Sequence, residues 1–427
     1  MKQPRRTFRF VCATSQRPAV EALLHEQGFE FEPEPFYEMA GRLIREPFPL
    51  GESLAARFGY IYIQDRSSML PPLLLNPPEG AGVLDMCSAP GSKTSLLSLL
   101  TGPGGFVFAS EPSADRIGTL RANLRRMNAA NAATTKMQAQ DLPFSESSWD
   151  YIQLDPPCSG WGTVDKNPKV MELWSEAKTG PLVTLQKTLL AKANAMLRPG
   201  GSVLFSTCTT NEAENEAQVE WALDALGLEL TSLAPPEGFE FDAPKRAGLD
   251  GVLRVSEESA GQGFFLARLR KPDDACAPER KTARPDAFSR SRRELASMRG
   301  VEEMTLDNLP PGEVHQFGSK LYFLHEKALE LVPQELRWQG FFLGKTTGRG
   351  EQARFIPNGM CRILMPKKLA AKGGDVLAVD EAARIEQLLS GQSLSFKPGA
   401  PLVGLYYRDL PMAWLSRKGK RVVLSSK

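Results

Sequence analysis

The feature of this 427-residue sequence that most constrains its fold is a regular alternation of short apolar runs and helix-like stretches between residues 82 and 271. Buried strands are indicated by GVLDMC (82–87), FVFASE (106–111) and SVLFSTC (202–208), and a helix by stretches such as SKTSLLSLL (92–100). Strands that alternate with helices of this length form parallel βαβ units, so the sequence predicts an α/β fold with a doubly wound open sheet. Such sheets bind their ligands at the carboxyl ends of the strands.

Composition divides the chain into four parts around this sheet. Residues 1–60 are expected to form a small N-terminal α/β subdomain, and residues 61–271 the sheet itself. The segment 272–294 is charged, rich in Ala and Pro and nearly free of large apolar residues, which is typical of a linker or a basic arm. Residues 295–427 contain short strand-like runs broken by Gly and Pro, so we expect a compact β-rich module there.

Charge is distributed unequally along the chain, although the formal net charge is only +2. Residues 271–427 carry 26 Lys and Arg against 18 Asp and Glu, whereas the residues before them carry 26 against 32. This asymmetry is typical of a protein whose basic part meets a polyanion, but mixed charge on a solvated surface accounts for it equally well.

The cysteines favour free thiols rather than a structural framework. The six of them are scattered without the CxxC spacing of a metal site, and the chain has only three histidines. We therefore expect no zinc site and a reducing, cytoplasmic location. The sequence also has no run of 18 apolar residues and no apolar signal core at its start, so neither membrane insertion nor secretion is expected. Without a heptad seam, a monomer is expected.

A tight turn joins the first strand of the predicted sheet to its helix in LDMCSAPGSKTSLL (84–97). The amino end of a helix exposes unpaired N–H groups, which favour a carboxylate or a phosphate. The turn matches neither GxGxxG nor a P-loop, so a nucleoside triphosphate is not indicated.

Three acids, Glu111, Asp141 and Asp155, follow three successive predicted strands. A single acid in such a place is usually a solvated turn or a helix cap. Three of them at one edge favour a binding site, in which Glu111 would accept hydrogen bonds from a ribose.

Two cysteines end two predicted strands. Cys158 lies in DPPCSG, and Cys208 lies in LFSTCTTNEAENE. A free cysteine is often only a small buried hydrophobe. Two of them at the ligand-binding edge of a sheet, each among Ser, Thr, Asp and Gly, instead indicate thiol chemistry.

Five segments, taken together, resemble the Nol1/Nop2/Sun family of RNA cytosine carbon-5 methyltransferases, in the order and spacing of that family over residues 5–271. They are YIQDRSSML (62–70), LDMCSAPGSKT (84–94), LDPPCSGWGT (154–163), LRPGGSVLFSTCTTNEAENE (197–216) and GFFLARLRK (263–271). The long basic tail is similar to that of the bacterial 16S ribosomal RNA enzymes of the F type, which carries a PUA-like RNA-binding module. The segment GLYYRDLPMAWLSRKGKRV (404–422) is similar to the end of that module.

The resemblance implies a Rossmann-like S-adenosylmethionine-dependent methyltransferase sheet and a division of labour between the two thiols. Cys208 would attack carbon 6 of cytosine, and Cys158 would help to remove the carbon-5 proton and release the product. Asp155 would hydrogen-bond the flipped cytosine and Lys93 would polarise it, although a strand-end turn acid and an ordinary first-turn lysine are simpler interpretations. A covalent step suits this chemistry, because carbon 5 is a poor nucleophile until a thiolate has added to carbon 6.

The cofactor implied by the resemblance is S-adenosyl-L-methionine, lying on the turn 87–93 with its ribose on Glu111 and its adenine near Asp141. Arg116 is a weaker candidate, because an arginine on a helix is usually solvated. The expected cofactor-binding residues are Cys87, Ser88, Ala89, Pro90, Gly91, Ser92, Lys93, Glu111, Arg116, Asp141 and Asp155.

The implied substrate is 16S ribosomal RNA, either free or within a ribosomal subunit, with transfer RNA as the alternative. Residues 1–60 would then be an RNA-binding subdomain. An alternative of another class is a non-catalytic RNA-binding assembly factor. The two thiols count against it, because a scaffold protein has no chemical need for them. A methyltransferase acting on an amino group would end this strand in NPPY or DPPY, and here Cys158 replaces the aromatic clamp.

RNA contacts are expected at exposed RNA loops, since a base must leave its stack to be methylated. The loop 161–177, with Lys166, Lys169, Trp161 and Trp174, could cover the substrate. Its tryptophans would either stack on a base or, as is more usual, anchor the loop. Phosphates would be held by basic clusters, which makes binding depend steeply on salt. The clusters lie at 281–293, 365–368 and 416–421.

Overall fold

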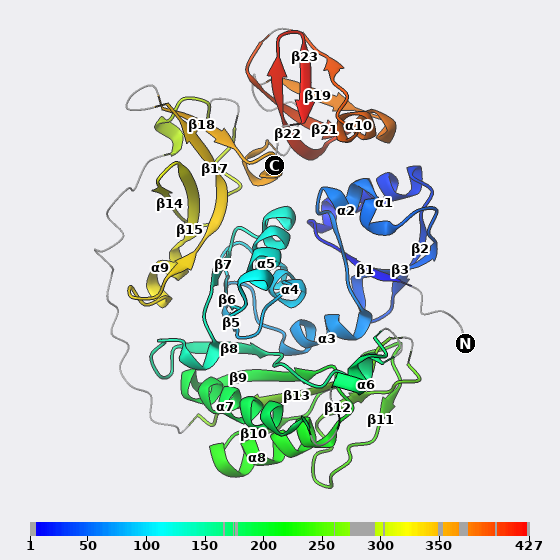
Figure 1. Ribbon diagram of the computed structural model, residues 1–427, viewed down its shortest axis with the longest axis vertical. Coiled ribbons are helices and arrows are strands. Elements are labelled where there is room, and N and C mark those ends of the chain that lie inside the picture. The colour runs from blue at the N-terminus through cyan, green and yellow to red at the C-terminus, as the bar shows by residue number, and fades with distance from the viewer. Residues whose placement is uncertain are drawn as a thin grey trace.

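The computed structural model shows four sheets in the part of the chain that it describes (Figure 1). The described residues are 6–164, 167–173, 175, 178–259, 261–273, 295–301, 304–348, 353–366, 375–397 and 399–424. Within these ranges no helix is both long and apolar enough to cross a membrane.

The N-terminal sheet is antiparallel, with the strand order β2-β3-β1-β4, and two short helices pack on it. Its elements are β1 (Thr7–Phe10), α1 (Arg17–Glu26), β2 (Glu30–Glu34), β3 (Tyr37–Arg45), α2 (Leu54–Arg57) and β4 (Ile61–Ile63). The sequence predicted two strands and a helix in this region. It missed β3, because the sequence of β3 does not alternate cleanly between apolar and polar residues. Because β4 pairs with β1, the sheet also extends past the expected boundary at residue 60.

The central sheet confirms the predicted α/β fold class. Its order is β11-β12-β13-β9-β8-β5-β6-β7-β16, with β10 paired to β13, and the five strands from β9 to β7 are parallel. The strands are β5 (Gly82–Asp85), β6 (Phe106–Ser110), β7 (Ala132–Thr135), β8 (Trp149–Leu154), β9 (Leu197–Thr207), β10 (Glu229–Thr231), β11 (Phe241–Asp242), β12 (Leu253–Val255), β13 (Phe264–Arg270) and β16 (Trp338–Gln339). The chain passes from β5 outward to β7 and returns to β8 on the other side of β5, so the crevice between β5 and β8 is the place where such sheets bind ligands.

Helices cover both faces of this sheet. One face packs against α3, α4 and α5, and the other against α7 and α8. The helices are α3 (Arg66–Leu75), α4 (Ser92–Leu100), α5 (Ala114–Met127), α6 (Val170–Leu173), α7 (Gly180–Met196) and α8 (Glu216–Leu226).

Two details of the central sheet differ from the sequence pattern. Strand β9 begins at Leu197 and therefore includes the RPGG segment, which was expected only to end the preceding helix. Strand β13 runs antiparallel to β9 rather than parallel, because helix α8 leads from β9 into β10, and β13 then pairs antiparallel with both β9 and β10.

The C-terminal region forms two sheets rather than one module. The first has the order β14-β15-β17-β18 and the second the order β19-β21-β22-β23-β20. Their elements are β14 (Gly312–Phe317), β15 (Lys320–His325), α9 (Glu326–Leu331), β17 (Phe341–Thr347), β18 (Arg354–Pro357), β19 (Val376–Val379), α10 (Ala382–Leu389), β20 (Leu394–Ser395), β21 (Leu402–Tyr407), β22 (Leu410–Lys418) and β23 (Arg421–Leu424). The β-rich character is as expected, and the PUA-like assignment stays a prediction.

Alternate residues of β21 attach the last sheet to two different neighbours. Leu402 and Tyr406 pack with the first C-terminal sheet. Val403, Leu405 and Tyr407 pack instead with the N-terminal sheet and its helices, residues 7–63, which we call the N-terminal unit. Figure 1 shows this sheet beside α1 and α2. Chain segments that are far apart in sequence therefore share one core. The expected linker at 272–294 lies, from residue 274 onward, outside the described residues, as do the basic cluster 281–293 and part of 365–368.

Candidate active site

The turn between β5 and α4 places Lys93 at the carboxyl edge of the central sheet. Gly91 has a φ of 100°, and a Cβ there would lie 2.8 Å from Leu120 Cδ1 on α5, so the close approach of the turn to α5 requires glycine. Helix α4 then begins at Ser92, and the Lys93 side chain in its first turn is only 12% exposed. The turn thus directs a buried cation toward the ends of the strands.

A cavity of about 300 Å³ opens at the crevice between β5 and β8. Seven residues of the expected site line it: Cys87, Ser88, Ala89, Pro90, Ser92, Lys93 and Asp155. The opposite wall comes from residues that were not expected, among them Tyr62 and Gln64 at the end of the N-terminal sheet and Gln262 before β13. The N-terminal unit therefore completes the cavity.

Lys93 and Asp155 form an ion pair in this cavity. Lys93 Nζ lies 2.7 Å from Asp155 Oδ2, and Ser206 donates a hydrogen bond of 2.8 Å to Asp155 Oδ1. Burial acts to lower the pKa of Lys93, but the charge and hydrogen bond of Asp155 outweigh it, so the pKa is raised and the side chain stays cationic. The structure thus holds one carboxylate and one ammonium group side by side at the strand ends.

The two cysteines singled out in the sequence adjoin this ion pair and each other. The Cys158 and Cys208 Sγ atoms are 3.4 Å apart, and both thiols are free. A hydrogen bond from Cys158 lowers the pKa of Cys208, and the nearby Lys93 acts in the same direction. That same bond, together with burial, raises the pKa of Cys158. Of the two thiols, Cys208 is therefore the one that ionises more readily.

The loops that carry the cysteines are joined by Glu214, which is fully buried. Its carboxylate accepts hydrogen bonds from the Ser159 backbone N–H at 2.9 Å and from the Ser159 hydroxyl at 2.5 Å. It also accepts from Gln186 Nε2 at 3.0 Å and Asn211 Nδ2 at 2.9 Å. Because Ser159 follows Cys158 directly and Glu214 is six residues past Cys208, this carboxylate ties the two cysteine loops together.

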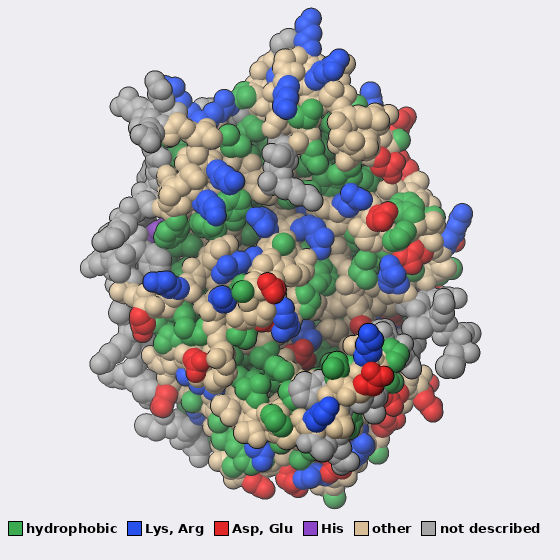
Figure 2. Space-filling view, in the orientation of Figure 1, with side chains coloured by type: hydrophobic (Ala, Val, Ile, Leu, Met, Phe, Trp, Pro, Cys, Tyr) green, Lys and Arg blue, Asp and Glu red, His purple; other side chains and the backbone are tan. Residues whose placement is uncertain are grey.

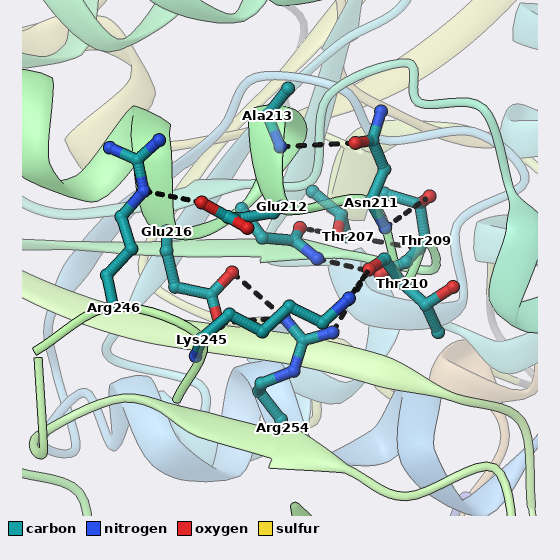
Figure 3. A network of polar contacts seen from close by, with 11 residues as sticks. Thr207, Thr209, Thr210, Asn211, Glu212, Ala213, Glu216, Lys245, Arg246 and Arg254 are labelled. Carbon is teal, nitrogen blue, oxygen red and sulfur yellow. Dashed lines mark hydrogen bonds and ion pairs between the residues drawn. The ribbon is translucent and has the colours of Figure 1, made fainter. Parts of the chain in front are cut away.

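A second network, drawn in Figure 3, fixes the chain that follows Cys208. Arg254 on β12 forms a buried ion pair with Glu216, with Nη1 at 2.8 Å and 2.9 Å from the two carboxylate oxygens. The same guanidinium donates to the Thr210 carbonyl at 3.0 Å, and Lys245 Nζ donates to it at 3.1 Å. The position of Cys208 thus depends on the antiparallel edge of the sheet as well as on β9.

The remaining candidates for a cofactor site lie beside the cavity. Glu111 at the end of β6 is buried and accepts a hydrogen bond of 2.9 Å from the Ser113 backbone N–H. Arg116 lies 3.3 Å from Glu111 and donates to the Ala89 carbonyl at 2.9 Å, so it ties this acid to the turn. Asp141 is exposed. The described lining of the cavity includes none of Gly91, Glu111, Arg116 and Asp141.

Only part of the loop expected to cover the substrate can be placed. Trp161 is half-buried at the start of a short turn of 3-10 helix, and Lys169 is exposed just before α6. Lys166 and Trp174 lie outside the described residues.

Besides the unexpected lining residues, two acids of the site were not singled out from the sequence. Asp85 ends β5 and accepts a hydrogen bond of 2.7 Å from Thr94, and burial raises its pKa to about 7. It could have been found by the strand-end argument that found the other three acids. Glu214 carries no such signal, because it follows its strand by seven residues among other polar residues.

The chain is similar to several known methyltransferases. The family described as 16S rRNA methyltransferase RsmB/F matches residues 72–270. Over 405 residues the chain is 31% identical to ribosomal RNA small subunit methyltransferase F of Shewanella amazonensis, an alignment that covers 90% of this chain and 85% of that protein. It is 35% identical over 280 residues to the protein of the same name from Shewanella loihica, covering 61% of this chain and only 57% of that relative's length. A crystal structure of a methyltransferase homologue from Pyrococcus horikoshii is 32% identical, with a TM-score of 0.55 over 63% of this chain and 87% of that one.

Proposed function

The chain belongs to the RsmB/F family of 16S rRNA methyltransferases, and on this basis we propose that it transfers a methyl group from S-adenosylmethionine to carbon 5 of a cytosine in 16S rRNA. The observation that carries the cytosine chemistry is the pair of free thiols 3.4 Å apart beside Lys93 and Asp155. Addition to carbon 6 requires a thiolate nucleophile, and release requires a second group nearby that can take the proton from carbon 5.

The residues around the cavity fit S-adenosylmethionine. The free N–H groups at the start of α4 suit its carboxylate, and the buried Glu111 at the end of β6 suits ribose hydroxyls. When bound there, the cofactor supplies the methyl group. The cofactor-binding residues of the turn 87–93 would then hold it within reach of the crevice between β5 and β8.

In the proposed reaction the protein's own groups act in sequence. The Cys208 thiolate forms a bond to carbon 6 of the flipped cytosine, which makes carbon 5 nucleophilic. Lys93 and Asp155 orient the ring, and their hydrogen bonds stabilise the charge that develops on it during attack. Once Cys208 is bonded to carbon 6 it no longer raises the pKa of Cys158. After methyl transfer Cys158, with its thiol proton lost to solvent, is the candidate base that takes the proton from carbon 5. The electrons of that C–H bond expel Cys208 as a thiolate, and the aromatic ring is restored.

The function predicts that the purified protein methylates 16S rRNA. We expect S-adenosylmethionine with a labelled methyl group to label a 16S rRNA transcript, and nuclease digestion followed by mass spectrometry to find the label in 5-methylcytosine. Transfer RNA in a parallel reaction tests the alternative substrate. Label in an N-methylated nucleoside would contradict carbon-5 chemistry, and no label in any RNA, with the transcript in its assembled subunit as well as free, would contradict the proposed activity.

The thiol pair also predicts a pH dependence. Because the pKa of Cys208 is lowered by a hydrogen bond from Cys158, the replacement Cys158→Ala should raise it. The rate at which iodoacetamide alkylates Cys208 should increase with pH through this pKa, so the midpoint of that increase should move to higher pH in the variant. Peptide mass spectrometry separates Cys208 from the other thiols. An unchanged midpoint would show that the hydrogen bond does not control the ionisation of Cys208.

A further inference from the structure

A second hollow lies away from the cavity, between α5 and the first C-terminal sheet. It has a volume of about 530 Å³, and its walls come from α5, β7, β15, β17 and β18. Its described lining includes neither of the two site cysteines nor any residue of the turn 87–93. We call it the α5 groove.

The α5 groove is lined by cations without acids. Arg121 and Arg125 extend into it from α5, and Lys320 and Lys345 from β15 and β17. None of the described residues that line it is acidic, and none of these four cations forms an ion pair with a described acid. Figure 2 shows Lys and Arg side chains gathered over the area where Figure 1 places α5 and β17. Unpaired cations in one groove attract a polyanion.

Aromatic rings lie beside these cations. The rings of Tyr322 and Phe342 are 5.4 Å apart, both are half-buried, and Arg125 lies 5.6 Å from the centre of the Phe342 ring. Phe317, which is 50% exposed, continues the row 6.0 Å from Tyr322. Partly exposed rings next to cations are typical of surfaces that hold single-stranded nucleic acid, where bases stack on the rings and phosphates meet the cations.

We propose that the α5 groove binds a single-stranded segment of the substrate RNA, outside the nucleotide that enters the active site. The identity of that RNA as the substrate rests on the proposed function. An acidic peptide would satisfy the four cations, but it would leave the row of rings without a partner, whereas RNA uses both.

Helix α5 connects the groove to the active site. Near its start Arg116 bonds the Ala89 carbonyl of the cofactor turn, and in the middle Leu120 contacts Gly91. At a rise of 1.5 Å per residue, Arg125 lies about 14 Å along the helix from Arg116. An RNA strand a few nucleotides long can therefore contact the groove while its target base is in the cavity.

The test measures RNA binding without methyl transfer. The full chain is titrated with a fluorescent 12-nucleotide oligouridine at several salt concentrations. The double variant K320Q/K345Q removes two exposed cations from the groove, and Tyr322→Leu removes a stacking surface. The matched control is K187Q/K192Q on α7, which has the same loss of charge on the opposite face of the sheet.

We expect the groove charge variant to weaken binding about tenfold and to reduce the slope of log K against log salt by about 1.4, which corresponds to two lost phosphate contacts. Tyr322→Leu should also weaken binding about tenfold, with little change in that slope. The control pair should bind as the wild type does.

Three outcomes would overturn the inference. The first is that groove and control variants lose the same affinity. The second is that neither variant differs from the wild type. The third is that a polyglutamate peptide, but not oligouridine, loses affinity with the groove charges, which would make the groove a protein-docking site. None of these outcomes depends on methylation. RNA binding by the α5 groove can therefore be disproved while 16S rRNA is still methylated. Conversely, a protein that methylates no RNA can still bind RNA in this groove.

Discussion

The replacement Cys208→Ser is expected to lower methyl transfer to RNA by at least about 10⁴-fold. The thiolate of Cys208, favoured by the hydrogen bond from Cys158 and by Lys93, is the nucleophile of the proposed reaction. A serine hydroxyl in the same place has no comparable anionic form near neutral pH, so addition to carbon 6 should stop. Initial rates of label transfer to 16S rRNA measure the loss.

The companion variant Cys158→Ser should give a different result. It keeps the nucleophile but loses the thiol that lies 3.4 Å from Cys208, so the covalent intermediate should form and then persist. A protein–RNA band that survives denaturant should accumulate in Cys158→Ser and be missing from Cys208→Ser. Cys12→Ser, which changes a free thiol in the N-terminal unit, is the control and should behave as the wild type does. An adduct that requires Cys158 instead of Cys208 would reverse the two roles.

The second large effect is expected at Glu214. In Glu214→Ala, four donor groups lose this acceptor: the Ser159 N–H, the Ser159 hydroxyl and the side-chain amides of Gln186 and Asn211. Leaving buried donors unpaired should cost about 3 kcal/mol locally, which corresponds to roughly 100-fold faster amide exchange in the segment 157–162. Hydrogen exchange followed by peptide mass spectrometry measures this directly.

We expect Glu214 to act on the reaction by positioning the two thiols, and a second measurement separates that role from general stability. If Glu214 sets the spacing of Cys158 and Cys208, its loss should also raise the pH midpoint for alkylation of Cys208, as Cys158→Ala does. The control is Glu212→Gln on the same turn, since Glu212 forms only a surface ion pair with Arg246 and should change neither quantity. Faster exchange with an unchanged alkylation midpoint would make Glu214 a structural residue only.

The sequence predicted which edge of the central sheet carries the site, but not which residues close its cavity. The strand-end argument brought Asp155, Glu111 and the turn 87–93 to one edge of the sheet, and the structure has them there. It could not show that Tyr62 and Gln262 would close the cavity, because they reach it through the docking of the N-terminal unit and of the loop before β13. Such docking depends on surfaces rather than on local periodicity.

The C-terminal region shows the same division. Its strands could be recognised from runs such as 401–416, which became β21 and β22. The division of these strands into two sheets could not be predicted. Strand β21 is buried along its whole length, so its sequence has no alternation of apolar and polar residues that would distinguish its two faces. Which face meets which neighbour is decided when the last sheet packs against the N-terminal unit.

The α/β sheet and the positions of the two cysteines and three acids at strand ends could be predicted from the sequence. This was possible because the periodicity of strands and helices and the chemistry of turns depend on a few neighbouring residues. The fold alone brings together Cys158 and Cys208, which are 50 residues apart in sequence, so that their Sγ atoms lie 3.4 Å apart. It also lets Glu214 join their two loops by hydrogen bonds. The physical reason is that this distance follows from the parallel register of β8 and β9 and from a buried acceptor shared by both loops. Those contacts exist only once the sheet has formed, and no short window of sequence contains them.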